Sequence, residues 1–286
     1  MQTLHHISAL RSAVSDWRAH ADSIAFVPTM GNLHDGHLRL VEQARARARR
    51  VVVSIFVNPL QFGPHEDYLS YPRTLAEDSL QLAERNVDLL FAPDERELYP
   101  SGVQGLTRVE VPGLSQVLCG VHRPGHFTGV TTVVNMLLNI VQPDVALFGE
   151  KDYQQLLIIR RMVADLHIAV DILGVATVRD PDGLAMSSRN QYLNPDQRRR
   201  APRLYEALRE AAARLQENPG SRAAVERRGL EQLEAAGFRP EYFAVRDAAT
   251  LAAPSRQTGA LVILAAAWLG RARLIDNISV PGEANE

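Results

Sequence analysis

The sequence of 286 residues contains a single cysteine, Cys119, and little to suggest export. One cysteine excludes an internal disulfide and fits a reducing compartment, so we expect a cytoplasmic protein. No apolar run approaches membrane-spanning length, and the first residues lack the basic segment and apolar stretch of a secretory signal. We therefore expect no membrane partner.

The chain also has little net charge, a formal −2. This balance gives no sign of the basic surface that nucleic acids require, so we expect no nucleic-acid partner. Hydrophobic residues make up 46% of the chain, which is enough for a sizeable core and too many for a disordered protein. The length suits one large domain or two modest ones.

Lysine is nearly absent, because Lys151 is the single lysine among 31 lysine and arginine residues. Codon usage is a sufficient explanation for the arginines. The two cations are not interchangeable where chemistry needs a compact point charge, since a guanidinium is a wide planar fork. Lys151 is therefore a candidate for a phosphate contact, with an ordinary surface lysine as the alternative.

What is present is a regular alternation of strand and helix patterns. Residues 51–57 form an unbroken run of β-forming apolar residues, which is typical of a parallel strand covered on both faces. We expect further strands at 24–30, 87–93, 145–152 and 170–178, with helices between them, including one at 129–142 that Thr128 could cap. This order predicts a right-handed parallel α/β sheet.

The pattern changes beyond about residue 185. Residues 196–236 read as two polar helices, and three closely spaced strand patterns follow them. These features predict a smaller α+β domain with an antiparallel sheet. We therefore divide the chain into domains at 1–183 and 184–286, with a turn signal at residues 180–183 near the boundary.

The first candidate site is the segment PTMGNLHDGH, residues 28–37, between the first of these strands and its helix. Ligands of parallel sheets bind at such carboxyl ends of strands, and a helix N-terminus offers N–H groups to phosphate. His34 and His37 lie three apart and could donate to phosphate oxygens, while Gly31 and Gly36 allow close approach. The alternative is a helix cap with two solvated histidines. The sequence has neither GxxxxGK[ST] nor a GxGxxG after the first strand.

Three more polar segments lie at predicted strand ends or at the domain boundary. Asn58 and Gln61 in VNPLQFG carry amides that fit hydroxyl, carboxylate or amine groups, although an ordinary Asn-Pro turn is the alternative. GEKD, residues 149–152, places Lys151 at the ligand edge of the sheet, with Gln155 about one turn further on. MSSR, residues 186–189, could wrap a triphosphate or be a polar linker.

Arg123 lies in a Gly/Pro loop, HRPGHFTGV, that could reach the site, and it is a better candidate than its neighbours His122 and His126. The histidines at 5, 6, 20, 65 and 167, and Cys119, are interpreted as surface or packing residues. No Cys, His or carboxylate cluster has the spacing of zinc ligands, so we expect no protein-held metal.

In this order, the motifs PTMGxLHxGH, VNPxQF, RPGHFxGV, GEKDxQQL, MSSRN and WLGxxRLIDN resemble the pantothenate synthetase family, over about residues 22–280. The shorter HxGH pattern occurs across many nucleotidyltransferases. The resemblance implies a Rossmann-like nucleotidyltransferase domain with a smaller C-terminal α+β lid domain, usually in a homodimer. It also implies a reaction of ATP, pantoate and β-alanine, with Mg²⁺, that gives pantothenate, AMP and pyrophosphate through a pantoyl adenylate.

The same resemblance implies roles for particular residues. His37 is the expected proton donor, and His34, Lys151 and Arg189 are the other catalytic candidates. The ATP-binding residues are Pro28, Thr29, Met30, Gly31, Asn32, Leu33, His34, Asp35, Gly36, His37, Gly149, Glu150, Lys151, Asp152, Val178, Met186, Ser187, Ser188 and Arg189. The substrate-binding residues are Gln61, Gln155, Asn58, Tyr71 and Arg123.

Two other functions are consistent with an HxGH motif. An adenylyltransferase would leave AMP on its product and would need no amine. A nucleotide-binding module without activity is the second alternative, and loss of His37 or Lys151 would have favoured it. Both residues are present.

Overall fold

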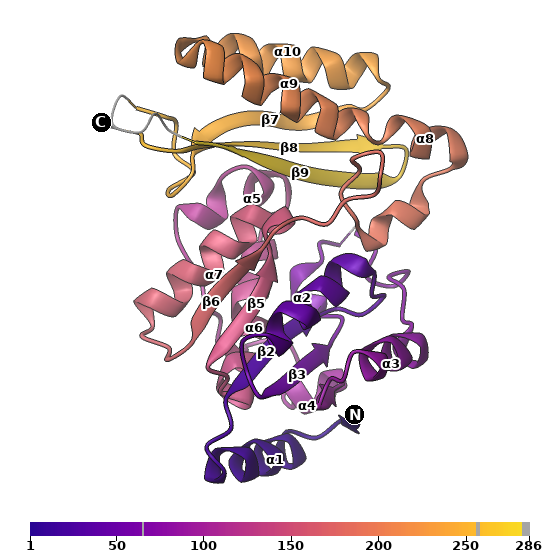
Figure 1. Cartoon of the computed structure of the whole chain (residues 1–286), viewed down its shortest axis with the longest axis vertical. Coiled ribbons are helices and arrows are strands. Elements are labelled where there is room, and N and C mark those ends of the chain that lie inside the picture. Colours follow the sequence, from indigo (N-terminus) through magenta and orange to yellow (C-terminus); the bar gives the residue numbers. More distant parts are fainter. Residues whose placement is uncertain (65, 256–257, 282–286) are drawn as a thin grey trace. The chain divides into compact units, whose positions relative to one another are not determined.

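The structure, a computed structural model that describes residues 1–64, 66–255 and 258–281, divides into two units. The first unit contains a sheet of six parallel strands, several of which are labelled in Figure 1. The strands are β1 Gln2–Leu4, β2 Ile24–Thr29, β3 Arg50–Ile55, β4 Leu89–Phe91, β5 Val145–Gly149 and β6 Asp171–Val175. Their order across the sheet is β1-β4-β3-β2-β5-β6. After β2 the chain adds strands on one side, and β5 then pairs on the other side of β2. The direction in which the chain adds strands to the sheet therefore reverses between β2 and β5.

The helices of this unit lie between the strands. They are α1 Ile7–Ala19, α2 Asp35–Arg45, α3 Leu75–Glu84, α4 Glu95–Leu98, α6 His126–Val141 and most of α7 Tyr153–Asp165, with short 3₁₀ turns η1 Pro59–Gln61 and η2 Leu114–Gln116. The 3₁₀ turn η3 Glu150–Asp152 begins in this unit, and its last two residues belong to the second unit. Val41 and Ala44 of α2 pack with Val27 and Val53 of the sheet in one buried cluster. Alternate strand residues thus meet α2, while the strands remain apolar on both faces, as buried parallel strands require.

The prediction that Thr128 caps the sixth helix is wrong. Helix α6 begins at His126, and Gly125 is its N-cap with φ of 80°. The backbone N–H of Gly129 already bonds to the carbonyl of Gly125 at 3.0 Å, so Thr128 lies inside the first turn. A glycine adopts this left-handed conformation at little cost, which lets the helix start directly after the Arg123 loop.

The second unit contains a three-stranded antiparallel sheet in the order β7-β8-β9. Its elements are β7 Arg239–Asp247, β8 Leu261–Leu269, β9 Ala272–Val280, α5 Cys119–His122, α8 Pro195–Arg200, α9 Arg203–Glu217, α10 Arg222–Ala235, and the 3₁₀ turns η4 Ser188–Tyr192 and η5 Pro219–Ser221. Leu208 of α9 and Leu233 of α10 pack with Phe243 and Ile263 of the sheet in a separate core. The unit thus has a hydrophobic core of its own.

The predicted fold class, a Rossmann-like parallel sheet with a smaller α+β part, is confirmed. Each unit is assembled from several stretches of chain. The first comprises Met1–Gln116, Arg123–Glu150 and Gln155–Ala176, and the second comprises Val117–His122, Lys151–Gln154 and Thr177–Glu286. Among the described residues, none of the helices combines the length and apolarity needed to cross a bilayer.

Candidate active site

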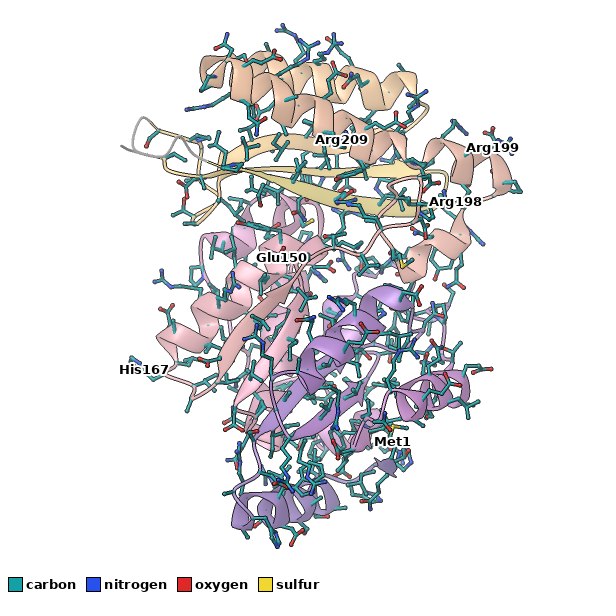
Figure 2. All side chains as sticks on the ribbon, in the orientation of Figure 1. Met1, Glu150, His167, Arg198, Arg199 and Arg209 are labelled. Atoms are coloured by element: carbon teal, nitrogen blue, oxygen red, sulfur yellow. The ribbon has the colours of Figure 1, made fainter. Side chains whose placement is uncertain are left out.

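The reversal of strand order between β2 and β5 marks the expected ligand position of the first unit. In open parallel sheets, ligands bind outside the carboxyl ends of the strands at such a switch point. The histidine loop follows directly from Thr29 at the end of β2, and Gly149 and Glu150 follow the end of β5 (Figure 2 labels Glu150). The two strands pair in register at Ala25 and Val145. The fold therefore brings two of the predicted segments to one edge.

The loop between β2 and α2 has an unusual backbone. Gly31 and Asn32 both have positive φ, of 77° and 52°. A Cβ on Gly31 would lie 3.0 Å from Asp78 Oδ2 and from Ile55 Cγ2, so both the angle and the space require glycine. Thr29 Oγ1 accepts from the N–H of Gly31 at 3.1 Å and donates to the carbonyl of Ser54 at 2.8 Å. These contacts fix the start of the loop.

Asp78 holds the other side of this loop. Its Oδ2 accepts from the N–H of Asn32 at 2.9 Å, and its Oδ1 accepts from the N–H of Leu33 at 2.8 Å. The carboxylate is 1% exposed and also accepts from Thr74 Oγ1 at 3.1 Å. Sequence reasoning missed this residue. The signal was an aspartate one turn before Leu82 on the buried face of helix α3.

His34 and His37 form a reciprocal cap at the start of α2. His34 is the N-cap, and its Nδ1 accepts from the N–H of Gly36 at 3.1 Å. The Nδ1 of His37 accepts from the N–H of His34 at 3.4 Å. A backbone N–H can only donate, so Nδ1 of each neutral ring is the acceptor and Nε2 carries the proton. The same two histidines therefore cap the helix and keep an N–H that could donate to a phosphate oxygen.

This arrangement suits a negatively charged ligand. Two Nε2–H donors stand beside the N-terminus of an 11-residue helix. The helix adds backbone N–H groups and the positive end of its dipole. The ring centroids are 4.1 Å apart, close enough for both rings to address one phosphate chain. The site can therefore stabilise charge that develops on phosphate oxygens.

Asn58 and Gln61 lie on the turn η1, just beyond β3. Gln61 is 9% exposed, and its Nε2 lies 2.9 Å from Met30 Sδ, which belongs to the histidine loop. Asn58 is 1% exposed and spends both N–H donors and both acceptor positions on protein groups. The hydrogen-bonding groups of the Asn58 side chain are thus all used by the protein in this structure. Substrate contacts by Asn58 and Gln61 stay predictions.

Arg123 reaches the same turn but is engaged by the protein. Its guanidinium forms two hydrogen bonds with the carboxylate of Glu66, at 2.6 and 2.5 Å, and its NH2 donates to the carbonyl of Gln61 at 3.3 Å. His126 Nδ1 bonds to the same carbonyl at 2.8 Å. Tyr71 is 6% exposed and meets Phe62 edge to face. Substrate contacts by Arg123 and Tyr71 stay predictions.

The predicted residues of the second unit also cluster. The carbonyl of Lys151 accepts from Asn277 Nδ2 at 3.0 Å, and its Nζ is 4.0 Å from the carboxylate of Asp152. A small pocket is lined by Lys151, Ser187, Asn190, Tyr205 and Asp276, with apolar residues around them. Lys151 and Ser187 of the MSSR segment therefore line one pocket.

The MSSR segment is held by its own backbone. The N–H of Met186 bonds to the carbonyl of Val178 at 3.0 Å, so these two predicted ATP-binding residues are neighbours. Ser187 caps the turn η4, since its hydroxyl accepts from the N–H of Arg189 at 3.3 Å. The segment is thus an ordered turn, and its contact with a triphosphate stays a prediction.

The two adjacent glutamines of GEKDYQQL are separated by their surroundings. Gln154 is 4% exposed, and within the second unit it bonds to the carbonyl of Val117 at 2.8 Å and the N–H of Cys119 at 3.1 Å. Gln155 belongs to the first unit and is half-buried. Gln154 therefore has a structural role, because it holds the backbone near Cys119. A ligand contact by Gln155 stays a prediction.

Within residues 1–64, 66–255 and 258–281, no group of three or more His, Cys, Asp and Glu side chains is arranged to hold a metal ion. His65, interpreted as a surface residue, lies outside the described residues. His167 is exposed, and Cys119 is buried with its Sγ 2.9 Å from Tyr242 Oη.

A doubly wound α/β sheet with a histidine-bearing helix N-terminus at its switch point is an arrangement that suits the binding of nucleotide phosphates. The family model for pantoate-beta-alanine ligase matches residues 2–279, so the chain belongs to that family. The pantothenate synthetase of Thioalkalivibrio sulfidiphilus is 58% identical over 280 residues, 98% of each chain. That of Methylococcus capsulatus is 57% identical over 271 residues, 95% of each chain.

Solved structures agree with this assignment. The crystal structure of pantothenate synthetase from Thermus thermophilus is 49% identical, with a TM-score of 0.91 over 98% of this chain and 100% of that one. The pantoate-beta-alanine ligase of Francisella tularensis, complexed with beta-gamma ATP and beta-alanine, is 35% identical, with a TM-score of 0.82 over 97% of each chain.

Proposed function

We propose that this protein condenses pantoate with β-alanine at the expense of ATP and forms pantothenate, AMP and pyrophosphate through a pantoyl adenylate. Family membership and the ATP-type and β-alanine ligands of the Francisella relative support the reaction. The observation that carries it is the pair of Nε2–H donors at the N-terminus of α2. Such an enzyme serves the biosynthesis of pantothenate and coenzyme A.

In the first step, a carboxylate oxygen of pantoate bonds to the α-phosphorus of ATP and the bond to pyrophosphate breaks. Negative charge then grows on the leaving oxygens, where His34 and His37 and the helix N-terminus oppose it. His37 is the proposed proton donor. In the second step the amine of β-alanine attacks the acyl carbon and AMP leaves. No covalent enzyme intermediate is needed, so catalysis rests on position and charge.

The remaining assignments are part of the proposal. In the first unit, Pro28–His37, Gly149 and Glu150 bind ATP, and Gln61 and Gln155 hold pantoate with help from Tyr71 and Arg123. In the second unit, Lys151, Asp152, Val178 and Met186–Arg189 also bind ATP. Lys151 and Arg189 supply the positive charges for the phosphates. The second unit acts as a lid in this proposal.

Mg²⁺ fits this donor set as a companion of ATP. The absence of a three-residue metal cluster among the described residues suits an ion that phosphate oxygens and water mainly hold. When bound, it would neutralise phosphate charge. We also propose a homodimer in the cytoplasm, as the family resemblance implies.

The decisive experiment is incubation with ATP, Mg²⁺, pantoate and β-alanine, followed by mass spectrometry of the products. We expect pantothenate and AMP in equal amounts, both dependent on β-alanine under multiple turnover. An adenylyltransferase would accumulate an adenylylated product without the amine. A protein that binds ATP and forms neither product would be a nucleotide-binding module and would contradict the proposal.

A further inference from the structure

The buried amide of Asn58 has an orientation that its neighbours determine. The backbone N–H of Leu60, which can only donate, lies 3.2 Å from Oδ1. The carbonyl of Gly129, which can only accept, lies 3.1 Å from Nδ2. A reversed amide would set donor against donor and acceptor against acceptor at a side chain that is 1% exposed. The two backbone groups therefore favour one orientation of the amide, and the Tyr99 hydroxyl, which donates to the same Oδ1, adds to this preference.

The orientation of the Asn58 amide determines the orientation of the Gln61 amide. Its Nδ2 donates to Gln61 Oε1 at 3.0 Å, so the oxygen of the Gln61 amide faces the protein. The amide nitrogen then faces the opposite way, toward Met30 of the histidine loop. Nε2 has two hydrogens, and Met30 Sδ is a weak acceptor for one of them. Gln61 thus offers N–H at the ligand edge of the sheet.

Tyr99 adds a further hydrogen bond to the Asn58 amide. Its side chain is 2% exposed, and its hydroxyl donates to Asn58 Oδ1 at 2.7 Å. Burial, reinforced by the charge of Glu95, raises the pKa of Tyr99 well above its usual range, so the hydroxyl remains a donor. Tyr99 was not selected from the sequence, because 41 residues separate it from Asn58.

The backbone of Gln61 is held as firmly as its side chain. Arg123 NH1 donates to His126 Nε2 at 2.9 Å, and an arginine cannot accept, so the His126 proton is on Nδ1. That Nδ1–H donates to the carbonyl of Gln61 at 2.8 Å. Both ends of the residue are therefore fixed before any substrate arrives, which lowers the ordering cost of binding.

We propose that Tyr99 and Asn58 are positioning residues that set the polarity of Gln61, so that its N–H, and not its oxygen, meets an acceptor oxygen of the hydroxy-acid substrate. The inference rests on the proposed function, in which Gln61 binds pantoate. It predicts that this contact rejects any group that can only donate. It also explains why a fully buried asparagine lies beside the substrate residue.

The first test is Tyr99→Phe, with Tyr68→Phe as the matched control. The Tyr68 hydroxyl bonds to Glu95 at 3.3 Å and takes no part in the chain. For Tyr99→Phe we expect the KM for pantoate to rise about tenfold, while the KM for ATP stays within about twofold. The rise should vanish in a Gln61→Ala background, because Tyr99 acts through Gln61. A general disturbance of the site would instead move both KM values and would persist in that background, whereas a loss of stability alone would lower the apparent kcat and leave both KM values unchanged.

The second test is Gln61→Glu, which replaces the N–H by an acceptor of the same shape. We expect it to bind pantoate no better than Gln61→Ala, with a KM at least about 100-fold above the parent. A Gln61→Glu enzyme with a KM near the parent value, or a Tyr99→Phe effect unchanged by Gln61→Ala, would overturn the inference. A parent enzyme that forms no pantothenate would instead reject the proposed function.

Discussion

Each imidazole at the start of α2 has two tasks, one for each ring nitrogen. The Nδ1 atoms of His34 and His37 cap backbone N–H groups, and the Nε2 atoms carry the protons that each ring can donate. A capping interaction of this kind contributes about 0.5–2 kcal/mol to stability. Alanine substitution would remove the capping role and the donor role together. Substitutions that retain one of the two roles are therefore needed to measure them separately.

Two substitutions of His37 achieve this separation. His37→Asn retains an acceptor close to the position of Nδ1, and His37→Gln retains a donor close to the position of Nε2. We expect His37→Asn to melt like the parent and to form pantoyl adenylate about 10²–10³ times more slowly. His37→Gln should be less stable and more active than His37→Asn. Single-turnover adenylate formation and thermal melting measure the two effects, and the reverse order of activity would remove His37 as a donor.

Lys151 is the second residue with a testable individual role. Its side chain is 18% exposed, in the pocket that Ser187 and Asp276 also line. A guanidinium is wider than an ammonium and needs a planar approach. We expect Lys151→Arg to melt normally but to form adenylate at least about tenfold more slowly, which is about 1.4 kcal/mol of barrier. An arginine variant as fast as the parent would make Lys151 a replaceable charge.

The residue scale also shows what sequence reasoning cannot reach. His34, His37 and Gln61 lie in short motifs whose chemistry is visible in one stretch of chain. Asp78 and Tyr99 act on those motifs across 46 and 41 residues of sequence. Only the three-dimensional structure shows that these residues contact the motifs. A buried aspartate in a helix is a signal, but it does not name the loop that it holds.

At the scale of elements, the turn η1 depends on the close approach of helix α6. A Cβ on Gly129 would overlap the carbonyl of Leu60 and the backbone nitrogen of Gln61. Glycine here is a matter of space, because its φ lies in the helical range. The approach is what places the carbonyl of Gly129 within reach of Asn58 Nδ2.

We therefore expect Gly129→Ala to displace η1. The cost in unfolding free energy should be about 1–3 kcal/mol, as for other overpacked sites, and the KM for pantoate should rise with it. Urea unfolding and steady-state kinetics measure the two. Gly149→Ala is a matched control for stability, since a Cβ there meets nothing within 4 Å. Equal stability of the two variants would contradict the packing argument.

The ion pair between Glu66 and Arg123 gives an element-scale dependence on pH. Burial alone would raise the pKa of Glu66, but the hydrogen bond and charge of Arg123 outweigh it and hold the pKa below the ordinary 4.5. The stabilisation is therefore complete above about pH 4.5 and is lost as pH falls through the lower folded value. Urea unfolding at pH 6 and pH 3.5 should show a smaller acid loss in Glu66→Gln than in the parent. Equal losses would mean that the pair does not couple to folding.

Most elements could be predicted because buried parallel strands are continuous apolar runs, as at Arg50–Ile55 and Val145–Gly149. The start of α6 could not, because Gly125 caps it with backbone geometry and without a side chain. The strand β1 and helix α1 were not predicted either. Gln2–Leu4 is three residues long and is defined only by its pairing with Leu89–Phe91.

At the scale of the whole molecule, the two units do not follow one another along the chain. Three stretches of each alternate, and the second unit includes Val117–His122 and Lys151–Gln154 as well as everything from Thr177. Sequence reasoning looks for a single boundary, where composition changes, and places it between residues 183 and 184. That boundary stays a prediction. The two short stretches carry no change of composition that could reveal them.

The segmented unit predicts that a C-terminal fragment is incomplete. Residues 177–286 alone would lack the partners of Tyr242 and Arg273, which contact Cys119, and of Asn277, which bonds to Lys151. The fragment keeps the core of the unit, so we expect it to unfold cooperatively but at a lower temperature than the full chain. Circular dichroism of the fragment beside the full chain measures this. A fragment as stable as the full chain would show that the two stretches are dispensable.

The same segmentation has a consequence for synthesis on the ribosome. Cys119 leaves the ribosome 123 residues before Tyr242 and 154 residues before Arg273, the groups that enclose its sulfur in the finished protein. At about 5–20 residues per second, the thiol waits roughly 6–30 s for them. During that interval the nascent chain carries an accessible cysteine, although the folded enzyme buries it. We therefore expect the Cys119 thiol to be most open to oxidants during translation, before these partners are made.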